Sequence, residues 1–366
     1  MITDEHIYQL SLTRITDIGS ILTKQLIDHF GSASAIFHAR KKELAAVEGI
    51  GEIRASQIKK FSDHHSSEQE LKKIEQHQLR LLFLTDEHYP QRLKNCPDPP
   101  LVLFFRGDRS LNPSRIISII GSRNATDYGR MVTEQLIEAL QPYDVMIVSG
   151  LAHGIDAIAH RSALQQQLPT IGVMAHGFKT IYPNTHRSLA KEMIHQGGLL
   201  TEFWFDTLPD RHHFPQRNRI VAGISDATIV IETAVKGGSM ITADLAFEYN
   251  RDVFAVPGRI TDLRSSGCLQ LIAQNKATAF TSPDQIIHAL GWLETKKKKN
   301  PQKKLFPELS SEEQIIISIL TTQEQMHVDE LYLKSKLPSS AMASAILNLE
   351  LQNLIIQLPG KRYQLS

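Results

Sequence analysis

Cysteine is almost absent from this chain: its 366 residues include two, Cys96 and Cys268, and neither has a second cysteine or a histidine at metal-binding spacing. Disulfide frameworks and structural zinc sites are therefore excluded, and reduced thiols in the cytoplasm are expected. The opening residues, MITDEHIYQL, are acidic and polar, unlike a signal peptide, and no apolar run approaches the roughly 18 residues of a membrane span. We therefore expect a soluble cytoplasmic protein with no membrane partner.

Net charge is nearly absent as well. The 40 Lys and Arg residues face 39 Asp and Glu residues, which leaves a net charge of +1 at pH 7. A chain without an overall field can bind a polyanion only through local groups of positive charge. The chain also lacks a GxGxxG dinucleotide turn, a P-loop ending in GK[ST] and a GxSxG nucleophile elbow. No cofactor is expected.

From Ile116 onward the chain does contain short apolar stretches that alternate with amphipathic helices. The predicted strands are IISIIG (116–121), DVMIVSG (144–150), TIGVMAH (170–176), LLTEF (199–203), ATIVIETA (227–234) and DVFAVPG (252–258). Continuous apolar strands that alternate with helices are typical of a mostly parallel sheet covered on both faces. We predict an α/β, Rossmann-like domain over residues 79–293.

Residues 1–78 are expected to form a small helical domain of the SAM or helix-hairpin-helix type. Two stretches of this region place an Ile-Gly turn before a helix. In the second, Gly49 and Gly51 would let backbone N–H groups approach a phosphate, whereas the first has Asp17 in place of the leading glycine. Contact with DNA and a purely structural role are both left open for this domain.

A winged helix is expected at the other end of the chain. Residues 294–308 are rich in lysine and read as an extended linker, and residues 309–366 read as three helices and a hairpin that turns at Pro359 and Gly360. The third helix, SSAMASAILNLELQNL, has no basic residue, although a helix that reads DNA normally presents such side chains. We expect this domain to contact protein, which argues against a transcription factor.

Several small or basic residues follow the predicted strands. Ligands of an open parallel sheet bind at the carboxyl ends of its strands, and small residues before a helix expose N–H groups that favour an anion. Arg217 and Arg219 flank Asn218 and are suited to bidentate phosphate contacts. The predicted anion-binding residues are Gly121, Ser122, Arg123, Ser149, Gly150, His153, Arg217, Asn218, Arg219, Gly237, Gly238 and Ser239.

The stretch VSGLAHGIDAIAH (148–160) places three possible metal ligands close together: His153, Asp156 and His160. No neighbouring side chain offers a fourth ligand, so we expect no metal. Asp156 and His160 are four residues apart on one predicted helix, which is the spacing of a structural ion pair or hydrogen bond. His153 lies in the preceding loop, and we expect it to face the ligand.

Three long motifs, IIGSRNATDYGR, VSGLAHGIDAIAH and FPQRNRIVAGISDATIVIETAVKGGSMITADLAFEYNRDVFAVPGRI, together resemble the DprA (Smf) family of DNA-processing proteins of bacterial natural transformation. The resemblance spans most of residues 80–280. It implies a protein that is not an enzyme, binds and protects single-stranded DNA, forms a homodimer through its Rossmann-like domain and helps to load the RecA recombinase. It also implies that the pocket is lined by Arg123, Ser149, Gly150, Arg217, Asn218, Gly238 and Ser239. From their position in the sequence alone, Phe178, Tyr182 and Phe214 are candidates for base stacking.

The sequence departs from the family pattern at three positions. His153 stands where arginine is more common, Pro169 where a lysine is usual and Leu269 where an asparagine is usual, so weaker or redistributed DNA contacts are expected. The alternative is an enzyme, a Rossmann-like nucleotide phosphoribohydrolase. In KGGSMITADLAFE (236–248) no glutamate stands where that family's catalytic acid belongs, so Asp244 or Glu248 would have to serve.

Overall fold

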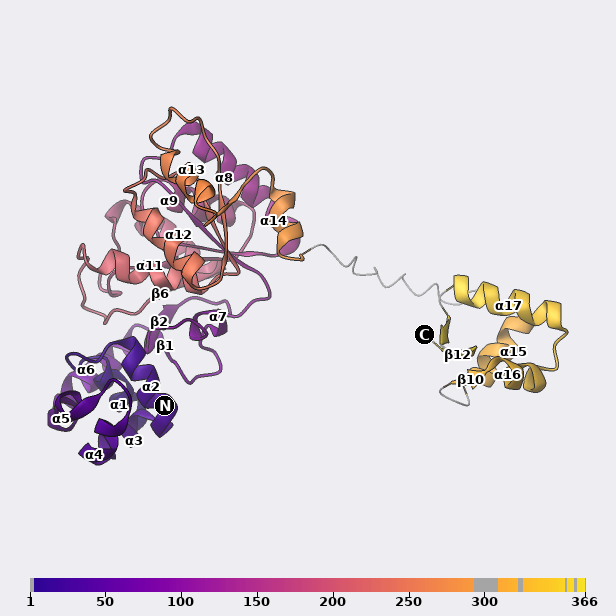
Figure 1. Cartoon of the computed structure of the whole chain (residues 1–366), viewed down its shortest axis with the longest axis horizontal. Coiled ribbons are helices and arrows are strands. Elements are labelled where there is room, and N and C mark those ends of the chain that lie inside the picture. Colours follow the sequence, from indigo (N-terminus) through magenta and orange to yellow (C-terminus); the bar gives the residue numbers. More distant parts are fainter. Residues whose placement is uncertain (1–2, 293–308, 322–324, 353, 359–360, 366) are drawn as a thin grey trace. The chain divides into compact units, whose positions relative to one another are not determined.

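The computed structural model describes residues 3–292, 309–321, 325–352, 354–358 and 361–365. They belong to two compact units, Met1–Trp292 and Leu293–Ser366 (Figure 1). The predicted linker at 294–308 and the predicted turn at Pro359 and Gly360 lie outside the described residues. The first unit includes both the helices before residue 78 and the whole large sheet, so the predicted domain limit at that residue stays a prediction.

The first unit is built on a nine-stranded sheet with the order β1-β2-β6-β5-β4-β3-β7-β8-β9. The strands from β3 to β9 pair in parallel, while β1 and β2 are antiparallel to each other and β2 is antiparallel to β6. Their bounds are β1 (Arg80–Phe83), β2 (Val102–Arg106), β3 (Ile116–Ile120), β4 (Met146–Ser149), β5 (Thr170–Val173), β6 (Gly198–Thr201), β7 (Ala227–Val230), β8 (Asp252–Ala255) and β9 (Thr278–Ala279). The predicted mostly parallel sheet is confirmed, and the six predicted strands are β3 to β8.

Both faces of the sheet are buried, because successive side chains of a strand point to opposite sides. In β3, Ile116 and Ile120 belong to one core and Ile117 and Ile119 to the other. The core around Ile117 is closed by α8 (Asp127–Leu140), α9 (Ile155–Gln165) and α14 (Pro283–Ala289). The core around Ile116 is closed by α11 (His213–Gly223), α12 (Gly238–Glu248) and α13 (Ser266–Ala273). Further helices are α7 (Gln91–Lys94) and α10 (Arg187–Gln196).

The amino-terminal helices add their apolar side chains to the core that holds β1 and β2. Leu26 and Ile58 belong to the same buried cluster as Phe104 of β2. The helices are α1 (Asp4–Leu12), α2 (Ser20–Phe30), α3 (Ala33–His38), α4 (Lys41–Ala46), α5 (Gly51–Lys60) and α6 (His64–Gln76). Figure 1 shows them gathered on the side of the sheet where β1 and β2 lie.

The two Ile-Gly turns of this region face each other. Gly49 and Gly51 have φ of +80° and +61°, and Asp17 has φ of +64°, a left-handed conformation that Asp tolerates better than most residues. The Arg54 guanidinium joins the turns by donating to the carbonyl oxygens of Gly49 and Asp17, at 2.6 and 2.9 Å. Backbone geometry alone accounts for both glycines, so DNA contact by this region stays open.

The second unit has the order of elements of a winged helix, as predicted. Its three helices are α15 (Ser311–Leu320), α16 (Val328–Ser335) and α17 (Ser339–Leu351). Its small sheet has the order β10-β12-β11, with β10 (Met326–His327), β11 (Ile355–Leu358) and β12 (Arg362–Leu365). Ile316, Leu331 and Leu349, one from each helix, form its separate core. In the described parts of both units, no helix has the length and apolar character needed to cross a bilayer.

Candidate nucleic-acid interface

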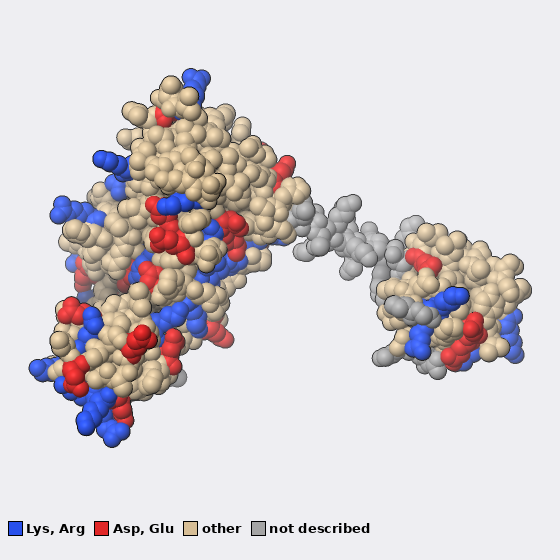
Figure 2. Space-filling model, in the orientation of Figure 1, with Lys and Arg blue, Asp and Glu red and all other residues tan. Residues whose placement is uncertain are grey.

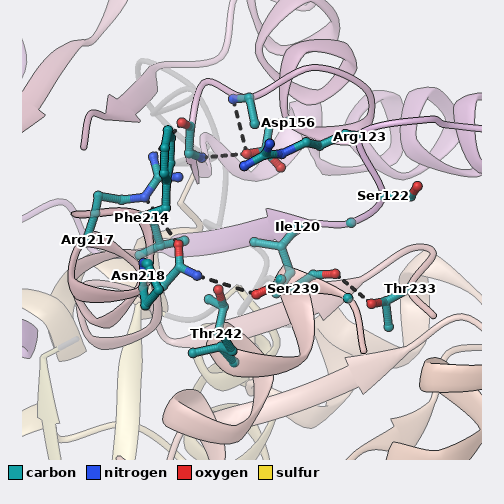
Figure 3. Close-up of a pocket in the computed structure, with 18 of the residues that line it drawn as sticks. Ile120, Ser122, Arg123, Asp156, Phe214, Arg217, Asn218, Thr233, Ser239 and Thr242 are labelled. Carbon is teal, nitrogen blue, oxygen red and sulfur yellow. Dashed lines mark hydrogen bonds between the residues drawn. The ribbon is translucent and has the colours of Figure 1, made fainter. Parts of the chain in front are cut away.

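A pocket of about 280 Å³ opens at the carboxyl ends of β3, β4 and β7 (Figure 3). The order of the sheet reverses here, because β3 lies between β4 and β7. Such a switch point leaves a crevice between loops that run in opposite directions, and it is where open α/β sheets bind ligands. Over the visible face of the first unit, Figure 2 shows acidic and basic side chains interspersed, which agrees with a net charge near zero.

The structure brings most of the predicted anion-binding residues together. They come from the loops after β3, β4 and β7, from α11 and from the start of α12. The predicted residues that line the pocket are Gly121, Ser122, Arg123, Gly150, Arg217, Asn218, Gly237, Gly238 and Ser239. Sequence reasoning missed several others, including Thr233 and Thr242. Thr242 could have been found, because it lies one helical turn after Gly238 on the same face of α12.

Arg123 is the exposed cation of the pocket. Its side chain extends from the loop after β3, and its guanidinium carbon lies 5.3 Å from the centre of the Phe214 ring. A guanidinium over an aromatic face is held by cation–π attraction and keeps its N–H groups free for an anion. Arg123 is therefore placed to hold a phosphate at the mouth of the pocket.

Arg217 is instead built into the pocket wall. Its side chain is buried, and its guanidinium donates to the carbonyl oxygens of Gly150 and Val173. Burial lowers the pKa of Arg217 to about 10, against the opposing attraction of Asp156. The group stays charged at neutral pH, so Arg217 gives the pocket positive potential while its N–H groups fix the loop after β4.

Backbone N–H groups at the start of α12 complete the anion-binding side. Gly237 must be glycine, since a Cβ would lie 2.4 Å from the hydroxyl of Thr233 and 2.9 Å from the carbonyl oxygen of Ala234. Ser239 fixes the same turn by donating to the Thr233 hydroxyl at 2.8 Å. A Cβ on Gly238 would meet nothing within 4 Å, so the first turn of α12 is open toward the pocket. Such a turn attracts anions.

An aromatic wall separates this pocket from a smaller one. Phe214 lines both, and the exposed ring of Tyr182 lies 5.9 Å from it, centre to centre. His153 lines the smaller pocket. Its ring lies edge to face against the ring of His186, with the two ring centres 4.9 Å apart. Of the three predicted stacking residues, Phe214 and Tyr182 are thus at the site. The third, Phe178, is partly buried against the core.

Two predicted residues lie elsewhere. Ser149 is fully buried, and its hydroxyl donates to the carbonyl oxygen of Ile119 at 2.6 Å. Arg219 is buried as well and pairs with Glu202, away from the pocket. Because residues two apart on a helix point to nearly opposite sides, Arg217 and Arg219 cannot both face the pocket. The prediction that both arginines hold phosphates is therefore wrong for Arg219.

The predicted pair of Asp156 and His160 is also wrong. The Asp156 carboxylate turns back to the loop before its helix and accepts from the N–H groups of Gly150 and Ala152, at 3.1 and 3.3 Å. His160 is fully buried, and its Nδ1 lies 2.7 Å from the Thr170 hydroxyl. Burial holds the pKa of His160 at about 3, so the ring is neutral at neutral pH. Among the described residues, no group of three His, Cys, Asp or Glu side chains is placed to hold a metal ion.

Two of the positions at which the sequence departs from the family pattern, Pro169 and Leu269, do not line the pocket. Pro169 stands just before β5, at the amino end of the strand, where its carbonyl accepts from the N–H of Ile147 at 2.9 Å. Pro169 therefore lies at the opposite edge of the sheet from the pocket, and the effect of the missing lysine on DNA affinity stays a prediction. Leu269 lies half-buried in α13 and is not among the lining residues.

The catalytic acids that an enzyme would need are not in the pocket. Asp244 forms an ion pair with Lys276 at 2.7 Å. Neither Asp244 nor Glu248 is among the residues that line the pocket. The one carboxylate in the lining, Asp156, is held by loop N–H groups and lies beside Arg217.

Comparison with known proteins places this architecture in one family. The family described as DNA recombination-mediator protein A matches residues 80–291, the DprA winged helix domain matches residues 300–361, and a helix-hairpin-helix motif matches residues 10–71. Protein Smf of Synechocystis sp. is 32% identical over the full length of both chains. DNA processing protein DprA of Bacillus subtilis is 42% identical over 55% of this chain and 68% of that protein.

Two solved structures agree. DNA processing protein A of Streptococcus pneumoniae is 30% identical, with a TM-score of 0.67 over 78% of this chain and 98% of that one. DNA processing protein A of Helicobacter pylori, a structure that concerns its single-stranded DNA binding mode, is 31% identical, with a TM-score of 0.54 over 59% and 96% of the two chains. The chain belongs to the DprA (Smf) family of DNA-processing proteins.

Proposed function

We propose that the protein binds single-stranded DNA in the pocket between β3, β4 and β7. The observation that carries this proposal is the convergence of Arg123, the buried charge of Arg217 and the first turn of α12 beside the Phe214 ring. Proteins that bind single strands combine anion contacts along the backbone with aromatic faces on which bases stack. The pocket contains both components within one crevice.

The geometry favours a single strand over a duplex. A base can enter a pocket of about 280 Å³ and meet the face of Phe214 only when it is unstacked, which a single strand permits at little cost. The third helix of the second unit, α17, contains no Lys or Arg, so this helix offers no basic side chain to a duplex groove. The similar protein from Helicobacter pylori, whose structure concerns a single-stranded DNA binding mode, supports the same choice.

From its family we further propose that the protein acts in the cytoplasm, protects incoming single strands, forms a homodimer through the first unit and helps to load RecA. A role as a nucleotide phosphoribohydrolase has less support, since Asp244 and Glu248 lie outside the pocket. Incubation with nucleoside monophosphates should therefore release no free base. RecA loading is testable on single strands that are already covered by a single-stranded DNA-binding protein. The rate of RecA-dependent ATP hydrolysis is then compared with and without the protein.

The binding proposal is tested by fluorescence anisotropy with a labelled single strand and a duplex of equal length, at two salt concentrations. The single strand should bind much more tightly, with little preference among sequences and with affinity that falls as salt rises. Equal affinity for the single strand and the duplex would contradict the assignment of the pocket.

A further inference from the structure

The buried carboxylate of Glu232 joins two loops of the pocket without lining it. Glu232 follows β7, is 1% exposed and is not among the residues that line the pocket. Its carboxylate accepts from the N–H of Thr126 at 3.0 Å and from the Thr126 hydroxyl. Thr126 ends the loop after β3 (121–126), which presents Arg123, whereas Glu232 belongs to the loop after β7 (231–237), which leads to α12. One side chain therefore ties the two anion-binding loops together.

The start of α8 is built around this carboxylate. Thr126 caps the helix, and its hydroxyl oxygen accepts from the N–H of Gly129 at 3.0 Å. A Cβ on Gly129 would lie 2.5 Å from Cδ of Glu232 and 2.6 Å from its Oε2, so the carboxylate reaches this turn only because position 129 is glycine. The helix dipole favours a negative group at this end. The start of α8 therefore already holds an anionic side chain of the protein, whereas the start of α12 is open to a phosphate.

The loop that presents Arg123 is held on both sides of that residue (Figure 3). On the amino side, the N–H of Ile155 at the start of α9 donates to the carbonyl oxygen of Ser122 at 3.1 Å. On the carboxyl side, the bonds from Thr126 to Glu232 hold the loop against the end of β7. An arginine on a loosely held loop samples many positions, and a phosphate contact then costs the entropy of ordering it. The two anchors keep Arg123 beside the α12 turn before a strand binds.

We propose that Glu232 is a positioning residue for single-strand binding: it fixes the loop of Arg123 relative to the first turn of α12, so that both hold phosphates of one strand. This inference rests on the proposed binding of a single strand in the pocket. The negative charge of Glu232 by itself repels a strand, so its removal would strengthen binding if the residue acted through charge alone. Positioning predicts the opposite sign, because the loop would lose its anchor.

The salt dependence of single-strand affinity, measured on the full chain, tests this role. Glu232→Ala should make the slope of log affinity against log salt shallower by about 0.7, the value for one lost phosphate contact, which weakens binding about fivefold at 0.1 M salt. Glu232→Gln should keep most of the parental slope, because its amide oxygen can accept from the Thr126 N–H while its NH₂ group donates to the hydroxyl oxygen. A role through charge alone would make the two variants alike.

A double variant separates positioning from a general effect on the fold. In an Arg123→Ala background, Glu232→Ala should not change the slope further, because the contact that it positions is already lost. The matched control is Glu202→Ala, which removes another carboxylate, 9% exposed and paired with Arg219 away from the pocket. This control should keep the parental slope. Thermal unfolding of each variant shows whether it is folded at the assay temperature.

A milder change keeps the test decisive if Glu232→Ala does not fold. Thr126→Val removes the hydroxyl at nearly constant volume and should shift the slope in the same direction. Its control is Thr133→Val on the same helix, where the buried hydroxyl donates to the carbonyl oxygen of Gly129 at 2.7 Å, and the slope should stay parental. A parental slope or tighter binding in Thr126→Val and in a folded Glu232→Ala, beside a shallower slope in Arg123→Ala, would overturn this inference and leave the proposed function standing. A parental slope in Arg123→Ala would overturn both.

Discussion

Replacing Arg217 with alanine should damage the fold more than it changes the salt dependence of DNA binding. The guanidinium lies inside the pocket wall, where it donates to the carbonyl oxygens of Gly150 and Val173 and lies beside the buried Asp156. Its removal leaves two carbonyl groups without this donor and one carboxylate without its cation. A buried acceptor that loses its donor typically costs about 1–3 kcal/mol, so the two carbonyl groups, together with the nearby uncompensated carboxylate, give an expected loss of about 3–5 kcal/mol.

At roughly 2–4 °C per kcal/mol, this loss lowers the unfolding midpoint of the first unit by about 6–20 °C. Differential scanning calorimetry of the full chain measures it. The matched control is Arg130→Ala, whose side chain is 55% exposed and 4.0 Å from Glu134, a surface pair worth about 1 kcal/mol or less. Adding Asp156→Asn to Arg217→Ala should restore part of the lost stability. A midpoint for Arg217→Ala within about 2 °C of the parent protein would refute the reasoning, given the magnitudes expected for buried pairs.

Three further predictions concern acid, metal and the second unit. The pKa of His160 is about 3 in the folded chain and about 6.5 when unfolded, so the unfolded chain takes up the proton and stability is lost as pH falls below 6.5. Between pH 6.5 and 4.5, protonation of this residue in the unfolded chain lowers the free energy of unfolding by about 2–3 kcal/mol. His160→Gln should remove this part of the pH dependence, which urea titrations at the two pH values measure. EDTA should change neither DNA binding nor the unfolding midpoint; stoichiometric zinc in the purified protein would show otherwise. Truncation after Trp292 should leave most single-strand binding intact in a filter-binding assay, because α17 has no cation. Loss of nearly all binding would show that the removed residues make the main contact with DNA.

The central strands were predictable because short apolar stretches rich in β-branched residues recur between longer amphipathic segments. IISII of β3 is apolar at nearly every position, which is typical of a short strand covered on both faces. The antiparallel strands β1 and β2 were missed, since RLLF and VLFFR lie before the repeat of strands and long helices that begins at Ile116, and the only helix between them, α7, has four residues. The strand β9 is two residues long, too short to leave a pattern.

The site was predictable to the level of loops, but not of side chains. The rule that ligands bind where parallel strands end identified the turns after β3, β4 and β7. It could not tell Arg217 from Arg219, because that depends on how α11 is rotated against the sheet. The spacing of Asp156 and His160 likewise allowed a pair, but the N–H groups of the loop after β4 and the Thr170 hydroxyl compete for them only in the folded chain.

The most direct test of the account is the salt dependence of single-strand affinity for Arg123→Ala, compared with Arg130→Ala as the matched surface control. Arg123 is exposed over Phe214, so its loss should remove one phosphate contact with little effect on stability. The slope of log affinity against log salt should become shallower by about 0.7, and binding should weaken equally for all sequences. Arg130→Ala should keep the parental slope. An Arg123→Ala protein with parental slope and parental affinity would contradict the assignment of this pocket to the DNA strand.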